Sequence, residues 1–303
     1  MPIEPFDEVL LDHSMDKEVT ERPVRHRGVT EPLGRLLAET GKISPEDAEK
    51  VAEFQKVHNL RFGEAALQLG LVSEDDIRYA LARQFDYPYL APGQNTFGAD
   101  LITAYSPNSE AAEAFRILRS QTALRWFSKG NKALFLCGAE GGEGVSYHVA
   151  NLAVVCSQLG EKTLIIDANF RAPRQHVTFN LGSNRQGLSD VLAGRATKFV
   201  YKFASLPGLS VIPSGTSPPN PAELLSRRNF ELLLRHLCNR YDVIVIDAPP
   251  INLYADTQSV AATVGGAVLV ARLNRSRIPQ LEKAKRLLQS SRAEIVGAVL
   301  NRR

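Results

Sequence analysis

A glycine-rich turn is the segment of the sequence best suited to hold a phosphate group. Its nine residues, from Gly138 to Ser146, read GAEGGEGVS and follow a short apolar run, Ala133–Cys137. This is the spacing of a phosphate-binding loop, in which backbone NH groups at a helix N-terminus surround phosphate oxygens. Val145 stands where such a loop usually has a lysine. Because glycine-rich turns between a strand and a helix are common, the loop alone is a weak signal.

Two aspartates add to that signal. Asp167 ends the apolar run Thr163–Asp167, and Asp247 ends the run Asp242–Asp247. A single aspartate at the end of a strand more often caps a helix or forms a turn. Two of them downstream of a phosphate-loop spacing could hold Mg2+, or its water ligands, against a phosphate. We therefore predict that these carboxylates lie beside a nucleotide phosphate.

A parallel sheet would bring these residues together. Six short, β-branched apolar runs are predicted as strands buried on both faces. They are Ala133–Cys137, Thr163–Asp167, Leu209–Pro213, Asp242–Asp247, Ala267–Arg272 and Ile295–Leu300. Helices are predicted over Ser146–Leu159, Pro221–Asn239 and Pro279–Ser290. This alternation predicts an α/β fold with a mostly parallel sheet flanked by helices, and such sheets bind ligands at the carboxyl ends of their strands.

Composition excludes several classes of function. The chain has 303 residues, 44% of them hydrophobic and 23% charged, as in ordinary soluble proteins, and its net charge of +3 is too small to indicate nucleic acid. Cys137, Cys156 and Cys238 have no metal-site spacing and lie in apolar stretches, as expected in a reducing compartment. Neither a signal peptide nor an apolar run of membrane-spanning length is recognisable, so we expect a cytoplasmic protein without a direct membrane span.

The order of segments predicts two domains of different kinds. Residues 1–28 mix charges without periodicity and are predicted as a flexible tail. Residues 29–92 are predicted as a small all-α domain and residues 93–108, which contain proline, glycine and asparagine, as a linker. The phosphate-loop domain then occupies residues 109–303.

The small helical domain contains an internal repeat. Its two 24-residue units, Pro32–Gln55 and Arg61–Gln84, are separated by five residues and correspond at an offset of 29. In each unit a serine, Ser44 or Ser73, is predicted to cap the second helix. Each unit is thus a helix pair that must pack on its twin to bury its apolar face.

From about residue 109 to its end, the chain resembles the bacterial tyrosine kinases (BY-kinases) that partner polysaccharide chain-length determinants. These kinases are relatives of the deviant Walker ATPases of cell division and chromosome partitioning. Seven segments carry the resemblance: Glu113–Arg119, the loop 138–146 with 151–153, Asp167–Pro173, Gly187–Gly194, Pro218–Leu225, Asp247–Pro250 and Gly297–Asn301. The resemblance implies a P-loop fold, ATP and Mg2+ as cofactors, and protein-tyrosine autokinase activity in exopolysaccharide biosynthesis and export.

The resemblance also implies roles for single residues. The nucleotide would be bound by Gly142, Gly144, Val145, Ser146, Arg171 and Asn301, the last of them near the base. Asp167 would assist removal of the proton from the attacking tyrosine, and Asp247 would be the Walker B acid. Ser146, Asp167 and Asp247 would together hold Mg2+.

A helical charge pattern bears on assembly. Glu113, Arg116 and Arg119 match an E-x-x-R-x-x-R motif that joins protomers into rings in this family. Their spacing places them on one helical face, where ion pairs between subunits are reasonable; a solvated charged face is the alternative. The resemblance implies a homo-oligomer that could be a ring, and a membrane-spanning chain-length determinant as partner, which would hold the protein at the inner face of the cell membrane.

The helical domain resembles the N-terminal domain of type II secretion ATPases. Some members of that family bind cyclic di-GMP through two tandem 24-residue motifs with a five-residue spacer. The second unit here begins Arg61-Phe62-Gly63, whereas the first begins Pro32-Leu33-Gly34 and lacks the arginine. Gly34, Arg61 and Gly63 are therefore the candidate contacts for the dinucleotide. A protein-docking module is the alternative.

The chain departs from the kinase pattern in four places. Val145 replaces the lysine that neutralises the transferring phosphate, and Asn169 replaces the second aspartate of the D-x-D-x-R motif. Gly141 stands where many relatives have proline, and the sequence ends at Arg303 without the tyrosine cluster that relatives phosphorylate on one another. ATP could still bind through backbone NH groups and Mg2+ ligands, while turnover would fall steeply.

Three functions are left open by these departures. The protein could be a tyrosine autokinase with weak catalysis, or a nucleotide-sensing or structural pseudokinase scaffold. A membrane-cycling deviant Walker ATPase is disfavoured because Ala139 occupies the position of its signature lysine. Formation of phosphotyrosine would separate the first two functions, and binding to liposomes would test the third.

Overall fold

The computed structural model describes residues 32–84, 89–90, 96–182 and 185–302. The tail predicted for residues 1–28 lies outside the described residues. The described chain forms two compact units, one up to Leu90 and the other from Thr96 onward. Within these residues, no helix has both the length and the apolar character needed to cross a membrane.

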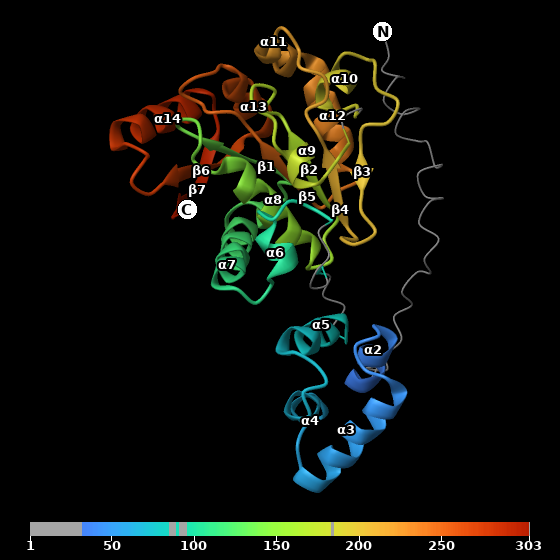
Figure 1. Cartoon of the computed structure of the whole chain (residues 1–303). Coiled ribbons are helices and arrows are strands. Elements are labelled where there is room, and N and C mark those ends of the chain that lie inside the picture. Colours follow the sequence, from blue (N-terminus) through green and yellow to red (C-terminus); the bar gives the residue numbers. More distant parts are fainter. Residues whose placement is uncertain (1–31, 85–88, 91–95, 183–184, 303) are drawn as a thin grey trace. The chain divides into compact units, whose positions relative to one another are not determined.

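The first unit consists of helices that repeat in pairs (Figure 1). They are α2 (Leu33–Glu39), α3 (Pro45–His58), α4 (Phe62–Gln68) and α5 (Glu74–Gln84). The hydroxyl of Ser44 accepts from the NH of Asp47 (3.0 Å) at the start of α3. The hydroxyl of Ser73 accepts from the NH of Asp76 (3.2 Å) at the start of α5. The two caps occupy equivalent positions of the repeat.

Equivalent glycines join the two repeats. A Cβ added to Gly34 would lie 2.7 Å from the ring of Phe62, and one added to Gly63 would lie 3.4 Å from Cδ2 of Leu33. Leu33 and Phe62 are themselves equivalent at the offset of 29. Each repeat therefore places its glycine against the apolar side chain of the other, so that the two repeats cover each other's apolar faces.

The second unit is built on a seven-stranded sheet with the order β3-β4-β2-β5-β1-β6-β7. Its strands are β1 (Ala133–Gly138), β2 (Thr163–Asp167), β3 (Tyr201–Lys202), β4 (Leu209–Ile212), β5 (Val243–Asp247), β6 (Gly266–Arg272) and β7 (Glu294–Asn301). All neighbouring strands are parallel except β3 and β4. The predicted α/β class with a mostly parallel sheet is confirmed. Strand β3, which has only two residues, was not predicted from the sequence.

Helices cover both faces of this sheet (Figure 1). On one face α8 (Val145–Ser157) packs on β1, β2, β4 and β5, and α6 (Ile102–Tyr105) and α7 (Glu110–Arg125) pack on α8. On the other face, five helices share one apolar core with the strands: α10 (Leu188–Leu192), α11 (Pro221–Ser226), α12 (Arg228–Cys238), α13 (Asp256–Val264) and α14 (Ile278–Ser290). Two short elements complete the described unit: η2 (Phe127–Lys129) and α9 (Gln175–Thr178).

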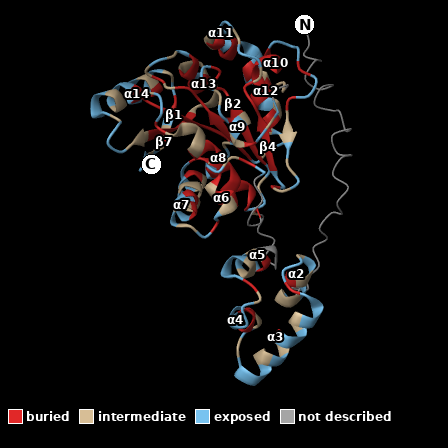
Figure 2. Cartoon of the chain, viewed as in Figure 1, coloured by how far each residue is buried: buried red, intermediate tan, exposed pale blue. Residues whose placement is uncertain are grey.

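Burial follows from this layered arrangement. Every residue of β1, β2, β4 and β5 is buried, whereas in the edge strand β7 only Val296 and Asn301 are buried (Figure 2). Continuous burial explains why the central strands read as uninterrupted apolar runs in the sequence.

The helix predicted over Pro221–Asn239 is two helices in the structure. Arg227 separates α11 from α12 because its backbone is extended, with φ −71° and ψ 150°. Propensity alone did not reveal this break, since Ser226 and Arg227 are both tolerated within helices.

The segment predicted as a linker, residues 93–108, also differs from the structure in part. It contains α6, whose Thr103 hydroxyl donates to Oδ1 of Asn151 in α8 (2.9 Å). Leu101 is completely buried. The second unit therefore begins before residue 109, and α6 helps to hold α8, the helix that follows the phosphate loop.

Candidate nucleotide site

The glycine-rich turn lies at the carboxyl end of β1 and leads directly into α8. Gly142 and Gly144 have φ values of +78° and +90°, which glycine adopts without the strain that a side chain would bring. The first residue of α8 is Val145, followed by Ser146. The first NH groups of a helix have no partner within the helix and point toward its N-terminus, which in α8 is the end that adjoins the loop, as phosphate binding requires.

The buried side chain of Glu143 stabilises the conformation of the loop. Its side chain is 1% exposed, and Oε2 accepts a hydrogen bond from the NH of Glu140 (3.0 Å). A Cβ on Gly138 would lie 2.2 Å from the same oxygen. Glycine at position 138 thus leaves the room that the buried carboxylate needs.

Gly144→Ala is expected to destroy the loop, because the substitution meets two obstacles at once. Asn301 Nδ2 donates to the carbonyl of Glu143 (3.0 Å), and a Cβ on Gly144 would lie 2.3 Å from that nitrogen. The backbone conformation at Gly144 also disfavours alanine. We expect nucleotide affinity to fall at least tenfold by calorimetry. The matched control is Gly141→Ala, since a Cβ at Gly141 meets nothing within 4 Å; equal effects of the two substitutions would contradict this prediction.

The two aspartates lie side by side at the carboxyl ends of neighbouring strands. Asp167 ends β2, Asp247 ends β5, and the two residues are partners in the sheet register. Both side chains are completely buried. Nε2 of Gln175 donates to Oδ2 of Asp247 (2.7 Å), and the side chain of Ser146 lies near enough to the same carboxyl group to lower its pKa. The loop and both acids are therefore brought to one place.

Burial raises the pKa of both carboxyl groups. For Asp167 the charge of Asp247 raises the pKa further, although three backbone NH groups donate to its oxygens. For Asp247 the hydrogen bonds from Gln175 and Ser146 oppose the effect of burial only in part. Two buried carboxylates so close together resist carrying two negative charges, and a divalent cation would favour the charged forms.

One oxygen of this pair fits a metal-bound water. Oδ1 of Asp247 is buried and makes no hydrogen bond with any described residue. Buried carboxylate oxygens normally have a partner. Mg2+ is commonly held through one or two carboxylates, water molecules and substrate phosphates, and Ser146 lies beside the same carboxyl group. The residues present therefore fit Mg2+ bound together with a nucleotide phosphate, where the ion would neutralise phosphate charge.

The nucleotide-free protein is expected to lose stability as the pH rises through the titration of this pair. An ordinary aspartate has a pKa of 3.8, whereas burial raises the pKa of Asp247 to about 6. Between these values the folded state binds more protons than the unfolded state, so the free energy of unfolding falls as the pH increases. Denaturant unfolding of the natural protein and of Asp247→Asn across this range measures the difference. A steeper fall in the variant would contradict the prediction.

Arg171 forms an ion pair with a buried aspartate, Asp256. Its Nε and Nη2 donate to the two oxygens of Asp256 (3.0 and 3.2 Å), and Asp256 is completely buried. The guanidinium also lies 4.7 Å from the centre of the Tyr254 ring. Because its charge is already matched, Arg171 is poorly placed to replace the lysine that is missing at Val145.

The three charged residues predicted to join protomers lie along α7. Within the chain, Arg116 donates to the carboxylate of Glu113 and to the carbonyl of Pro107. Nη1 of Arg119 donates to the carbonyl of Val155 in α8 (2.8 Å). In the single chain these side chains therefore stabilise α7 and its packing on α8. Their role between protomers stays a prediction.

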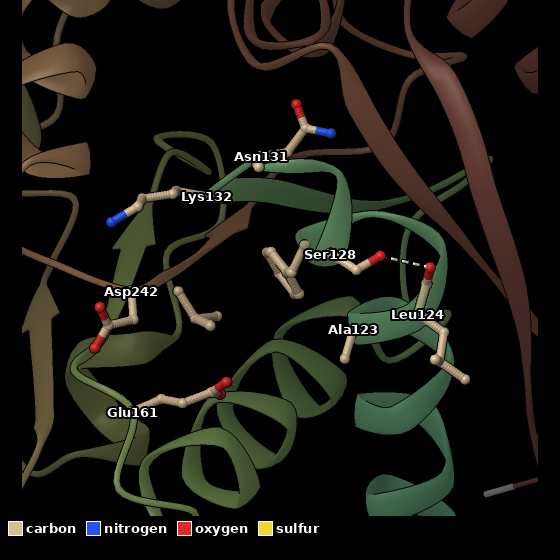
Figure 3. Close-up of a pocket in the computed structure, with 10 residues that line it drawn as sticks. Ala123, Leu124, Ser128, Asn131, Lys132, Glu161 and Asp242 are labelled. Atoms are coloured by element: carbon tan, nitrogen blue, oxygen red, sulfur yellow. Dashed lines mark hydrogen bonds between the residues drawn. The ribbon is translucent and has the colours of Figure 1, made fainter.

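A pocket of about 400 Å³ lies at the other end of the strands (Figure 3). Its lining includes Lys132, Glu161 and Asp242, which precede β1, β2 and β5. Because these strands are parallel, their amino ends lie away from Asp167 and Asp247. Burial raises the pKa of the Glu161 carboxyl group, and a second acid lines the same pocket, so it is poorly suited to a phosphate.

Three residues of the site were not predicted from the sequence. Gln175 joins Asp247 to the carbonyl of Ser146, Glu143 supports the loop, and Arg275 lies over Gly142. Arg275 follows β6 at the same edge of the sheet, and this position after a predicted strand was the available signal. The contacts of Gln175 depend on chain packing, which no local pattern reveals.

Comparison with known proteins agrees with this geometry. No protein-family model matches the chain. It is 35% identical over 203 residues to the tyrosine-protein kinase YwqD of Bacillus subtilis, covering 67% of this chain and 85% of that protein. It is 35% identical over 191 residues to the tyrosine-protein kinase CpsD of Streptococcus agalactiae, covering 63% and 82%.

A solved structure shows the same relationship. The kinase domain of the Escherichia coli tyrosine kinase Etk is 33% identical, with a TM-score of 0.63 over 66% of this chain and 79% of that one. A seven-stranded, mostly parallel sheet, a phosphate loop at the start of α8 and paired acids at neighbouring strand ends are combined in one unit. The chain therefore belongs to the family of bacterial tyrosine-protein kinases.

Proposed function

We propose that this protein binds Mg-ATP at the loop 138–146 and uses it mainly to control its own assembly, with weak or no phosphoryl transfer. The observation that carries this proposal is the combination of an intact loop and a buried acid pair with valine at position 145. The parts that bind a phosphate through backbone groups and Mg2+ are present. The lysine side chain that would move with the transferring phosphate is absent, because position 145 is a valine.

Loss of the lysine affects binding and turnover unequally. A charge-assisted hydrogen bond contributes roughly 1.5–3 kcal/mol, and backbone NH groups and Mg2+ still hold the phosphates. Removal of one donor that stabilises a transition state costs roughly 10²–10³ in rate. A protein with Val145 can therefore bind ATP and yet turn it over slowly.

The biological process is proposed from the family. We infer a role in exopolysaccharide biosynthesis and export, in which the protein controls polymer chain length together with a membrane-spanning chain-length determinant. Such a partner would hold it at the inner face of the cell membrane. Assembly into a homo-oligomer through Glu113, Arg116 and Arg119 of α7 is part of the same proposal, and a working tyrosine autokinase is the alternative.

Calorimetry of the full chain with Mg-ATP, together with detection of phosphotyrosine, tests the proposal. Binding without phosphotyrosine supports it. Strong phosphotyrosine formation at a rate typical of kinases, about 1–100 per second, would favour the autokinase. Absence of binding would exclude any nucleotide-dependent function of this site.

The helical unit has a second candidate role. Both glycines are in contact with apolar side chains: Gly34 with Phe62, and Gly63 with Leu33 and Ile77. This close packing explains why glycine is needed at both positions without invoking a ligand. Arg61 is exposed, and its counterpart in the first repeat is Pro32. We therefore propose that this unit docks another protein. Titration with cyclic di-GMP tests the choice, since saturable binding that Arg61→Ala abolishes would assign the dinucleotide instead.

A further inference from the structure

The loop after β6 is tied to the phosphate loop. Nη1 of Arg272, the last residue of β6, donates to the carbonyl of Gly142 (3.1 Å). The hydroxyl of Ser276 donates to the buried carboxylate of Glu143 and accepts from the NH of Arg272 (2.8 Å). These contacts fix residues 272–276 against the glycine-rich turn, although the two segments lie about 130 residues apart in the sequence.

Arg275 is thereby placed on the glycine-rich turn itself. A Cβ added to Gly142 would lie 2.8 Å from Nη2, 3.0 Å from Cζ and 3.1 Å from Nη1 of Arg275. The whole guanidinium therefore lies over the one position of the loop where a side chain would collide with it. Arg275 is exposed, and among the described residues no carboxylate forms an ion pair with it.

The loop needs cations from elsewhere in the chain. Its residues 138–146 include Glu140 and Glu143 and no lysine, arginine or histidine, so they contribute a charge of −2. Asp167 and Asp247 lie beside it. Mg-ATP is itself an anion, and its binding to such a site requires positive charge at the phosphates. Arg171 cannot easily supply it, because the buried carboxylate of Asp256 already holds that guanidinium.

We propose that Arg275 is the phosphate-binding cation of this site and takes over, for binding, the charge that Val145 lacks. A guanidinium offers donors in a planar arrangement that matches phosphate oxygens, and its charge is permanent. Arg272 is a positioning residue, since it anchors the loop through the Gly142 carbonyl. The proposal rests on the nucleotide binding proposed above and adds a residue that strengthens such binding in the absence of the lysine.

Calorimetric titration of the full chain with Mg-ATP, Mg-ADP and AMP tests this assignment. The variants are Arg275→Gln, Val145→Lys and the two combined, with Arg286→Gln as control. Arg286 is exposed on α14 and its replacement changes the net charge equally. We expect Arg275→Gln to weaken Mg-ATP binding by about 10- to 100-fold and AMP binding by less than threefold, with no change for Arg286→Gln. In the Val145→Lys background the loss should shrink to less than threefold, because the lysine then carries the phosphate charge.

The outcomes separate this assignment from the proposed function. If the natural protein binds Mg-ATP and Arg275→Gln behaves like Arg286→Gln, the assignment is overturned while the proposed function stands. An equal loss in both backgrounds would also overturn it, because Arg275 would then act independently of position 145. If only proteins with Val145→Lys bind, Arg275 does not replace the lysine and the natural chain is not a nucleotide sensor. If no variant binds, the proposed function fails and the assignment fails with it.

Discussion

Val145→Lys is expected to raise the rate of ATP turnover by about 10²–10³-fold over the natural protein. Val145 is the first residue of α8 and is half-buried, and the side chain of the next residue, Ser146, lies near Asp247. A lysine at this position would carry its ammonium group from the helix N-terminus along the phosphate chain. Arg275 lies over Gly142, and the contacts of Arg272 hold the segment after β6 against the loop. A cation there can hold a bound phosphate but cannot follow the phosphate that is transferred.

The matched control for this substitution is Val145→Met, which adds length without charge. ADP release should distinguish the two variants, and phosphotyrosine formation should be followed in the same samples. A lysine variant that hydrolyses ATP no faster than the methionine variant would show that the missing cation does not limit turnover. The buried acid pair would then be the limiting feature.

Much of the second unit is predictable from its sequence because its central strands are buried on both faces. Continuous apolar runs such as Thr163–Asp167 have no competing helical pattern, and this strand has the predicted bounds. The glycine spacing of the loop and the acids after β2 and β5 are local signals as well. Right-handed connections then bring these signals to one edge of a parallel sheet.

The rest of the site depends on contacts between distant segments. Gln175 donates to Asp247 across 72 residues, and Ser276 reaches Glu143 across 133. No spacing rule connects such residues, and an arginine in a surface loop reads as an ordinary solvated charge. The error over residues 93–108 has a related cause, because α6 is stabilised by Thr103 and Asn151 rather than by helix propensity of its own four residues.

Asp247→Asn is expected to stabilise the nucleotide-free protein while weakening its binding of Mg-ATP. Burial raises the pKa of the carboxyl group to about 6, so at neutral pH the folded chain holds a charge that burial disfavours. Linkage puts the resulting loss of stability on the order of 1–3 kcal/mol. An asparagine oxygen can still accept from Gln175 at the position of Oδ2, and the substitution removes the charge that raises the pKa of Asp167.

Asp190→Asn is the contrasting control, since that buried carboxylate accepts from the NH groups of Gly187 and Thr216 and lies 3.9 Å from a nitrogen of Arg195. We expect this control to lower stability and to leave nucleotide affinity nearly unchanged. Denaturant unfolding at pH 7 and calorimetry with Mg-ATP measure both effects. If Asp247→Asn lowers stability as Asp190→Asn does, the acid pair is a structural element of the sheet. A gain in stability coupled to a loss of at least tenfold in Mg-dependent affinity would instead identify a carboxylate retained at a cost to folding because the metal site requires it.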